Sequence, residues 1–179
     1  MTALDTAPTF HEITLTAGDL TLRPLAGSDA DDVAEACQDL ETLRWLPIPR
    51  PYTLANAEWF IGTVFAIQSA GRLAGVVDLK HVNWASRVAE VGYWVAPWAR
   101  GRGVASRASR ALAEWAICDH GFERVELFAT TGNIASQRAA EKAGFVREGV
   151  ARNAGYVHDG RVDLVLFSLV PDDLQRFSR

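Results

Sequence analysis

The sequence predicts a single α/β domain in which a mixed β-sheet is covered by helices. In the first half of the chain, several short stretches alternate apolar and polar residues with period two, which is typical of half-buried strands. Further along, strand-like and helix-like stretches follow one another, which indicates a sheet with helices packed on it. A chain of 179 residues with 49% hydrophobic content is large enough to bury one core.

The N-terminal part of the chain is predicted to hold a tail, a hairpin and a helix. Residues 1–11 are polar and are expected to be flexible, so that residues 12–179 form the domain. Residues 13–25 alternate apolar and polar side chains about a turn, which predicts a β-hairpin or a bent first strand. Ser28 precedes a run of acids and is a suitable N-cap for a helix over residues 29–40.

The next segment, residues 45–52, contains three prolines and is predicted to be an extended, semi-rigid loop. Thr53 is a suitable cap for a second helix that runs to about Gly62. The remaining predicted strands are residues 63–68, 73–82, 87–95, 124–129, a strand that starts at Phe145, and 161–169. The remaining predicted helices are residues 104–120 and 133–143, the second of which ends at Gly144.

A glycine-rich turn joins the strand that ends at Val95 to the helix that begins at Val104. Pro97 interrupts the strand, and Arg100-Gly-Arg-Gly103 follows it. A helix that begins after such a turn points several unpaired N–H groups outward, with about half a positive charge behind them, and can hold a phosphate. No Gly-Lys-Ser/Thr follows, and Ser106 occupies the place of a third glycine, which excludes a P-loop and a Rossmann fingerprint.

Two motifs carry a resemblance to a known family. Arg100-x-x-Gly103-x-Ala105 after an apolar strand resembles the acetyl-CoA pyrophosphate motif of the GNAT N-acetyltransferase superfamily, and residues 133–145 resemble its second signature. Asn133-x-x-Ser136, together with Gly92-Tyr-Trp94, resembles the branch that contains the ribosomal-protein N-terminal (alanine/serine) acetyltransferases. The resemblance covers residues 20–170.

The resemblance implies a GNAT-like fold and an acetyl-CoA site. The sheet is expected to be mostly antiparallel and to splay between two parallel strands, residues 90–95 and 124–129, where the pantetheine arm pairs with an exposed edge. A backbone N–H near Val95 is expected to stabilise the oxyanion. The implied acetyl-CoA contacts are Trp94, Val95, Arg100, Gly101, Arg102, Gly103, Val104, Ala105, Asn133 and Ser136.

The reaction needs a base for the amine and a donor for the departing thiolate. Glu90, on the strand that leads to the cofactor, is the predicted base, and the alternatives are Glu126, Asp78, His81 and His158. Many GNAT enzymes carry a tyrosine four residues before the Gly-Phe pair, but this chain has Ala140 there. The resemblance implies that Ser136 takes over, with Asn133 on a pantetheine amide. Tyr156 is a second candidate acid, and Arg138 or Lys142 can meet the 3′-phosphate.

The acceptor is predicted to be a primary amine, first a protein or peptide N-terminus. A small amine such as an aminoglycoside or polyamine, and a non-catalytic acyl-CoA-binding sensor, remain alternatives. In GNAT relatives the region after the first strand borders the acceptor, so Trp45, Tyr52, Trp59 and Phe60 are candidates for the acceptor wall or for the core. The resemblance also makes a homodimer possible, with the apolar last strand at its interface.

Composition and charge restrict the partners. A net charge of −4 disfavours a protein that coats nucleic acid. Cys37 and Cys118 show no metal-ligand spacing and are predicted to be small buried thiols, so no metal is expected. The sequence shows no signal-peptide pattern and no apolar run long enough to span a membrane, which predicts a cytoplasmic protein.

Overall fold

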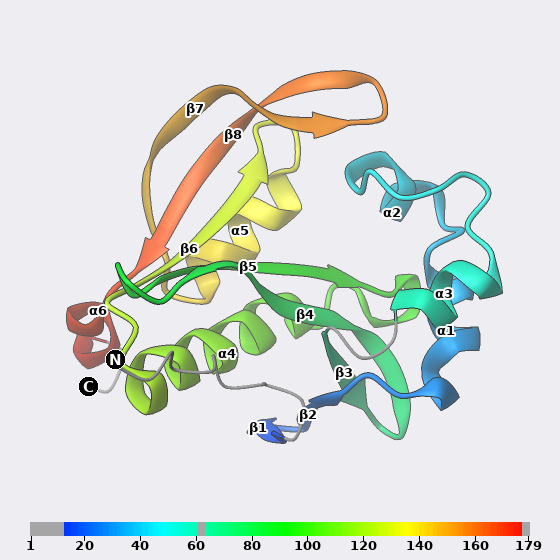
Figure 1. Cartoon of the computed structure of the whole chain (residues 1–179), viewed down its shortest axis with the longest axis horizontal. Coiled ribbons are helices and arrows are strands. Elements are labelled where there is room, and N and C mark those ends of the chain that lie inside the picture. Colours follow the sequence, from blue (N-terminus) through cyan, green and yellow to red (C-terminus); the bar gives the residue numbers. More distant parts are fainter. Residues whose placement is uncertain (1–12, 61–63, 177–179) are drawn as a thin grey trace, which may run out of the picture.

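The computed structural model describes residues 13–60 and 64–176. The predicted tail, residues 1–11, lies outside them. The described residues form an eight-stranded sheet in the order β1-β2-β3-β4-β5-β6-β8-β7 (Figure 1). The strands are β1 (Leu15–Ala17), β2 (Leu20–Pro24), β3 (Phe65–Ser69), β4 (Arg72–Asn83), β5 (Val88–Val95), β6 (Arg124–Thr130), β7 (Val146–Val157) and β8 (Gly160–Leu169). The predicted N-terminal hairpin is β1–β2.

The sheet opens between β5 and β6. These strands are the only parallel neighbours in the described sheet, and they pair at three positions, Val88↔Arg124, Ala89↔Val125 and Glu90↔Glu126. Beyond Glu90 each strand keeps its outer partner, β4 or β8, while the two strands diverge (Figure 1). The splayed, mostly antiparallel sheet is therefore confirmed.

Helices cover both faces of the sheet, as predicted. They are α1 (Ala30–Ala36), α2 (Leu40–Trp45), α3 (Leu54–Phe60), α4 (Val104–His120), α5 (Ile134–Lys142) and α6 (Pro171–Arg176). The apolar stripe of α4 packs into the main core, where Leu112 is fully buried. Burial of one such leucine contributes about 1.5–3 kcal/mol. On the opposite face α1 and α3 pack over a smaller core around Val33 and Ala57.

The predicted helix over residues 29–40 is wrong in its length. The helix α1 ends at Ala36, and Asp39 starts α2 by accepting the Thr42 N–H at 2.9 Å. Ser28 lies in a short 3-10 turn and caps neither helix. Because Asp39 restarts the helix, Trp45 belongs to α2 and not to the extended loop, which the prolines confine to the residues after it.

Other expectations differ in detail. Thr53 does cap α3, since its Oγ1 accepts the Asn56 N–H at 3.3 Å. The strand that starts near Phe145 continues to Val157, and α6 was not predicted. Cys37 is buried, but Cys118 is exposed because it lies on the outer side of α4. Among the described residues no helix is long and apolar enough to cross a membrane.

Candidate active site

The turn before α4 has the backbone that the sequence predicts. Gly101 and Gly103 both adopt left-handed conformations, with φ of 75° and 71°. A Cβ on Gly101 would meet nothing within 4 Å, and a Cβ on Gly103 would meet only Ser106 Oγ, at 3.6 Å. Backbone conformation, rather than tight packing, therefore favours glycine at both positions. We call residues 100–103 the anion loop.

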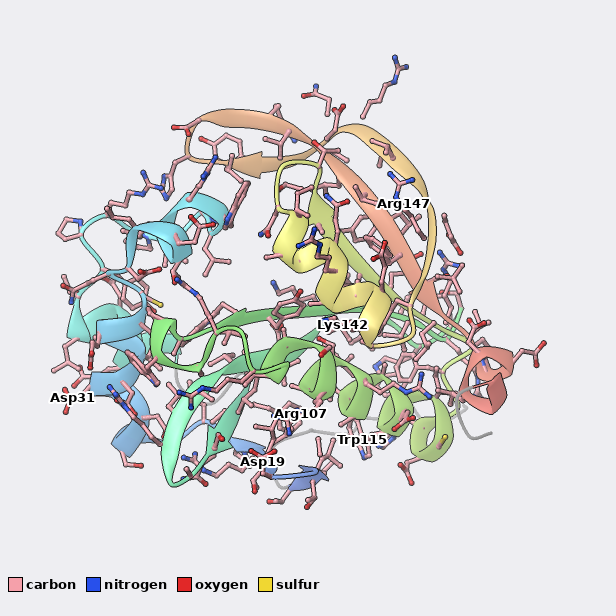
Figure 2. All side chains as sticks on the ribbon, turned by 180° about the vertical axis from the view of Figure 1, so that it is seen from behind. Asp19, Asp31, Arg107, Trp115, Lys142 and Arg147 are labelled. Carbon is pink, nitrogen blue, oxygen red and sulfur yellow. The ribbon has the colours of Figure 1, made fainter. Side chains whose placement is uncertain are left out.

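The first turn of α4 leaves donors free behind the anion loop. Gly103 is the N-cap, and the Arg107 N–H donates to its carbonyl at 3.1 Å. The N–H groups of the three residues between them have no preceding helical turn to bond to. The Arg107 side chain forms an ion pair with Asp19 in the β1–β2 turn (Figure 2) and donates to the Arg102 carbonyl at 3.4 Å. It thus fixes the helix start that presents these donors.

The two arginines of the anion loop differ. Arg100 Nη2 donates to Asp39 Oδ2 at 2.6 Å and to Thr42 Oγ1 at 2.7 Å, so its guanidinium joins the anion loop to α2. This contact contributes to holding the pKa of the Asp39 carboxyl below its usual value, although burial opposes it. Arg102 is exposed and does not line the cavity described below.

The diverging edge of β5 carries unpaired backbone groups. The Ala96 N–H donates to the Ala74 carbonyl of β4 at 2.9 Å. Because N–H groups alternate in direction along a strand, the Val95 N–H points away from β4, toward the gap before β6. By the same alternation the Tyr93 N–H faces the gap, whereas Trp94 is paired in register with Val76 of β4.

A cavity of about 610 Å³ occupies this gap. It extends from the anion loop and the first residues of α4 to the start of α5, the end of α2 and the β7–β8 hairpin. Its lining includes the predicted base, Glu90, and all the predicted acetyl-CoA contacts except Arg102, namely Trp94, Val95, Arg100, Gly101, Gly103, Val104, Ala105, Asn133 and Ser136. One continuous site therefore unites the two sequence motifs.

Comparison with known proteins identifies the family. Residues 19–146 match the model of the acetyltransferase (GNAT) domain. The chain belongs to the GNAT acetyltransferase family. It is 37% identical over 100 residues to the "Putative ribosomal N-acetyltransferase YdaF" of Bacillus subtilis, a match that covers 56% of this chain and 55% of that protein. It is 27% identical over 109 residues to the ribosomal-protein-serine acetyltransferase of Escherichia coli, with 61% of each chain covered.

The fold comparison agrees with this assignment. A solved structure of RimL, the ribosomal L7/L12 alpha-N-protein acetyltransferase in complex with coenzyme A, superposes with a TM-score of 0.80 at 19% identity, covering 90% of this chain and 99% of that chain. This likeness shows the fold. The two sequence relatives are matched over little more than half of their lengths.

In this GNAT chain Glu90 lies on the face of β5 away from α4. Its Oε2 is 2.8 Å from Nδ1 of His81, and its side chain is 21% exposed. His81 has a left-handed φ of 46°, in a region where the β4–β5 register shifts. Such a conformation is uncommon for a residue with a side chain, and here it brings the ring to Glu90.

The other candidate bases have different surroundings. Burial raises the pKa of Asp78 to about 6, with Lys80 and His81 opposing and Glu90 adding to the rise. Asp78 and Lys80 both crowd the space above Gly92, where a side chain would collide with them. Glu126 is bound by Arg124 at 2.8 Å. His158 contacts the Ile48 carbonyl at 2.8 Å and thereby connects the β7–β8 hairpin to the loop after α2.

On the α4 side of β5 the residues of the second motif meet a tyrosine. Asn133 Oδ1 caps α5 by accepting the Ser136 N–H at 3.0 Å. Ser136 Oγ lies 2.9 Å from the hydroxyl of Tyr93, whose pKa burial raises while Ser136 lowers it. Ala140, at the position of the usual tyrosine, is fully buried. Sequence reasoning missed Tyr93 as a site residue, although period-two alternation from Glu90 already put the two on opposite faces.

The structure describes the side chains of two of the four candidates for the acceptor wall, Trp45 and Tyr52. Trp45 lines the cavity, with its indole N–H donated to Glu41 at 2.8 Å and its ring against Gly132. Tyr52 is buried in the smaller core and does not line the cavity. The side chains of Trp59 and Phe60 lie outside the described part of the chain. Tyr156, which is 59% exposed, and Arg138 and Lys142 line the cavity.

Proposed function

We propose that this protein is an acetyl-CoA-dependent N-acetyltransferase that moves an acetyl group to a primary amine, foremost the α-amine of a protein or peptide N-terminus. The observation that carries the proposal is the single cavity that joins the anion loop, the splayed edge of β5, Glu90 and Ser136. Transfer is by direct attack of the amine on the thioester. Cys37 is buried and Cys118 lies outside this cavity, so neither supplies a covalent nucleophile.

The anion loop and the start of α4 would hold the pyrophosphate of acetyl-CoA. The left-handed glycines allow close approach of the backbone, and the free N–H groups of the first helical turn carry partial positive charge. The pantetheine arm would then run along the diverging edge of β5. The Val95 N–H, which points into the gap, is the proposed donor to the thioester oxygen. The coenzyme A complex of RimL supports the same cofactor class.

Glu90 is the proposed base, with His81 as its partner. Because Glu90 lines the cavity and keeps limited exposure, it can accept a proton from the amine directly or through a water. An α-amine has a pKa of about 7.7–8.0 against about 10.4 for lysine, so a weaker base is enough to deprotonate it.

The peptide acceptor is supported by two further observations. Trp45 and Tyr156 both line the cavity, and the contact of His158 with the Ile48 carbonyl connects the β7–β8 hairpin to the loop after α2; we place the acceptor between these two segments. Two of the sequence relatives bear names of ribosomal-protein acetyltransferases. We therefore propose an extended N-terminal segment of a protein as the substrate.

The test measures release of the CoA thiol from acetyl-CoA with N-terminal peptides, aminoglycosides and polyamines as acceptors. We expect turnover with peptides, and a loss of about 10²–10⁴-fold in kcat for Glu90→Gln. The matched control is Glu126→Gln, which removes the neighbouring carboxylate in register on β6, outside the cavity lining. It is expected to retain kcat within a few fold.

Different results would replace the proposal. Turnover of aminoglycosides or polyamines without peptides would make the protein a small-molecule acetyltransferase. Tight acetyl-CoA binding without transfer to any acceptor would favour an acyl-CoA sensor. Equal losses in Glu90→Gln and Glu126→Gln would remove Glu90 from the role of base.

A further inference from the structure

The proposed mechanism does not use the hydroxyl of Tyr93, a half-buried residue that lines the cavity. It lies 2.9 Å from Ser136 Oγ and 3.4 Å from the Ser136 carbonyl oxygen. The tyrosine is on β5 and the serine is on α5, so the contact joins the two elements that flank the gap. Both residues line the cavity.

The two hydroxyl protons can be arranged in two ways. If Ser136 donates to Tyr93, the Tyr93 hydroxyl can donate only to the Ser136 carbonyl oxygen, and this hydrogen bond is long, at 3.4 Å. If Tyr93 donates to Ser136 Oγ at 2.9 Å, the serine proton is free to point elsewhere. Since Ser136 lines the cavity, the second arrangement offers this proton to a ligand. A negatively charged ligand atom that accepts a hydrogen bond would favour this second arrangement, because hydrogen bonds to charged groups are stronger than those between neutral groups.

We propose that Tyr93 is a positioning residue for Ser136. The Tyr93 hydroxyl donates to Ser136 Oγ and so directs the serine proton to the sulfur of the departing CoA thiolate. This inference rests on the proposed function. In the step, the amine nitrogen bonds to the acetyl carbon, and the C–S bond breaks with its electron pair on sulfur. The amine proton goes to Glu90 and then to water, and the thiolate takes its final proton from water.

The pKa values explain why the pair of Tyr93 and Ser136 donates a hydrogen bond to the thiolate without losing its protons to it. A thiol has a pKa of about 8.5, whereas an unperturbed phenol has a pKa of about 10. Burial raises the pKa of Tyr93 further, so a thiolate cannot remove its proton to any extent. The chain from Tyr93 through Ser136 to sulfur therefore stabilises the thiolate by hydrogen bonds that polarise one another. Ala140, one turn further along α5, offers no hydroxyl.

The experiment needs no acceptor. The affinities of CoA and of desulfo-CoA, which lacks the thiol, are measured by calorimetry from pH 6 to pH 10. In the wild type we expect the affinity for CoA, relative to that for desulfo-CoA, to rise with pH. The rise should begin below the ordinary pKa of a thiol, because the protein stabilises the bound thiolate. Tyr93→Phe and Ser136→Ala should each reduce this preference at high pH by about tenfold, as for one lost hydrogen bond to a charged group. The double variant should lose little more than either single one.

A matched control is Tyr52→Phe, which removes a phenol that is buried in the smaller core and away from the cavity. It should keep the wild-type preference and its pH dependence. If Tyr93→Phe also keeps both, or weakens the two ligands equally, Tyr93 only packs and the inference is overturned. If the wild type binds neither ligand, the proposed function fails as well. Failure to acetylate any amine would overturn the proposed function alone.

Discussion

Glu90 and Tyr93 lie on opposite faces of the same strand, β5. The register with β4 runs without interruption from Lys80↔Glu90 to Gly75↔Val95, so the two side chains must alternate. Glu90 accordingly meets His81, and Tyr93 meets Ser136 across the core side. In the proposed reaction the amine loses its proton on one face of the splayed sheet and the thiolate departs on the other.

This separation predicts additive effects on kcat. Glu90→Gln and Tyr93→Phe act on different reacting groups with no shared partner, so the two losses should add within about 0.5 kcal/mol. Tyr93→Phe and Ser136→Ala remove members of one chain and should be strongly non-additive. Single-turnover rates of the single and double variants provide the measurement. Non-additivity between Glu90 and Tyr93 would mean that one network connects the two faces.

The local parts of this site could be predicted from the sequence, because they depend on neighbouring residues. The anion loop, the helix that follows it and the Asn133 cap are of this kind. The contacts of Tyr93 with Ser136, 43 positions away, depend on where α5, which packs on β6 and α4, lies across the gap from β5, and no local pattern contains this. The break before α2 was missed for a related reason, since Asp39 acts both as its cap and as the partner of Arg100, 61 positions away.

The anion loop can be tested at Gly103. In Gly103→Ala the left-handed φ of 71° costs about 1–2 kcal/mol of stability, and the new methyl group obstructs the approach of a phosphate. Gly103→Asn should lose less stability than Gly103→Ala, because asparagine tolerates the left-handed conformation. Both variants should lose acetyl-CoA affinity to the same extent. Calorimetric Kd values and urea unfolding separate the two effects. The control is Gly149→Ala, which adds a Cβ that meets nothing within 4 Å at a residue without positive φ. Full acetyl-CoA affinity in Gly103→Asn would contradict the role of the anion loop in binding the pyrophosphate.

The acceptor wall can be tested at Trp45. Its indole is held by Glu41 and by contact with Gly132, so it presents a fixed apolar surface to the cavity. We expect Trp45→Ala to raise the peptide KM by about tenfold, the cost of losing one buried aromatic anchor, while the acetyl-CoA Kd changes little. Trp84→Ala removes a tryptophan that packs on Phe122 outside the cavity, and it should change neither constant. A rise in both constants for Trp45→Ala would indicate a general loss of structure.

The cysteines should differ sharply in reactivity. Burial raises the pKa of Cys37 to about 12, whereas Cys118 is exposed on α4. Because the thiolate is the reactive form, one thiol per chain should react with an aromatic disulfide reagent at pH 8, and the second only after unfolding. Cys118→Ser should abolish the fast reaction, and Cys37→Ser should leave it. Rapid labelling of two thiols in the folded wild type would contradict the burial of Cys37.

The half-buried carboxyl of Asp78 makes the stability of the fold depend on pH. Its pKa is about 6 in the folded protein, mainly because burial disfavours the charged form, against about 3.9 in an unfolded chain. The folded state therefore binds the proton more tightly than the unfolded state. Its contribution to stability is fully present below about pH 4 and is lost as the pH rises to about 6, above which it stays constant.

Asp78→Asn should remove this dependence, because the amide cannot ionise. Two pKa units correspond to about 3 kcal/mol, so the variant should be more stable than the wild type at pH 8 by up to that amount and similar to it at pH 4. Urea unfolding at pH 4, 6 and 8 measures the difference between the two proteins, in which the other titrating groups cancel. Asp159→Asn, at an exposed carboxyl in the β7–β8 turn, is the matched control for the loss of one carboxylate. A difference between Asp78→Asn and the wild type that does not change with pH would contradict the raised pKa of Asp78, and would mean that water or Lys80 compensates for its burial.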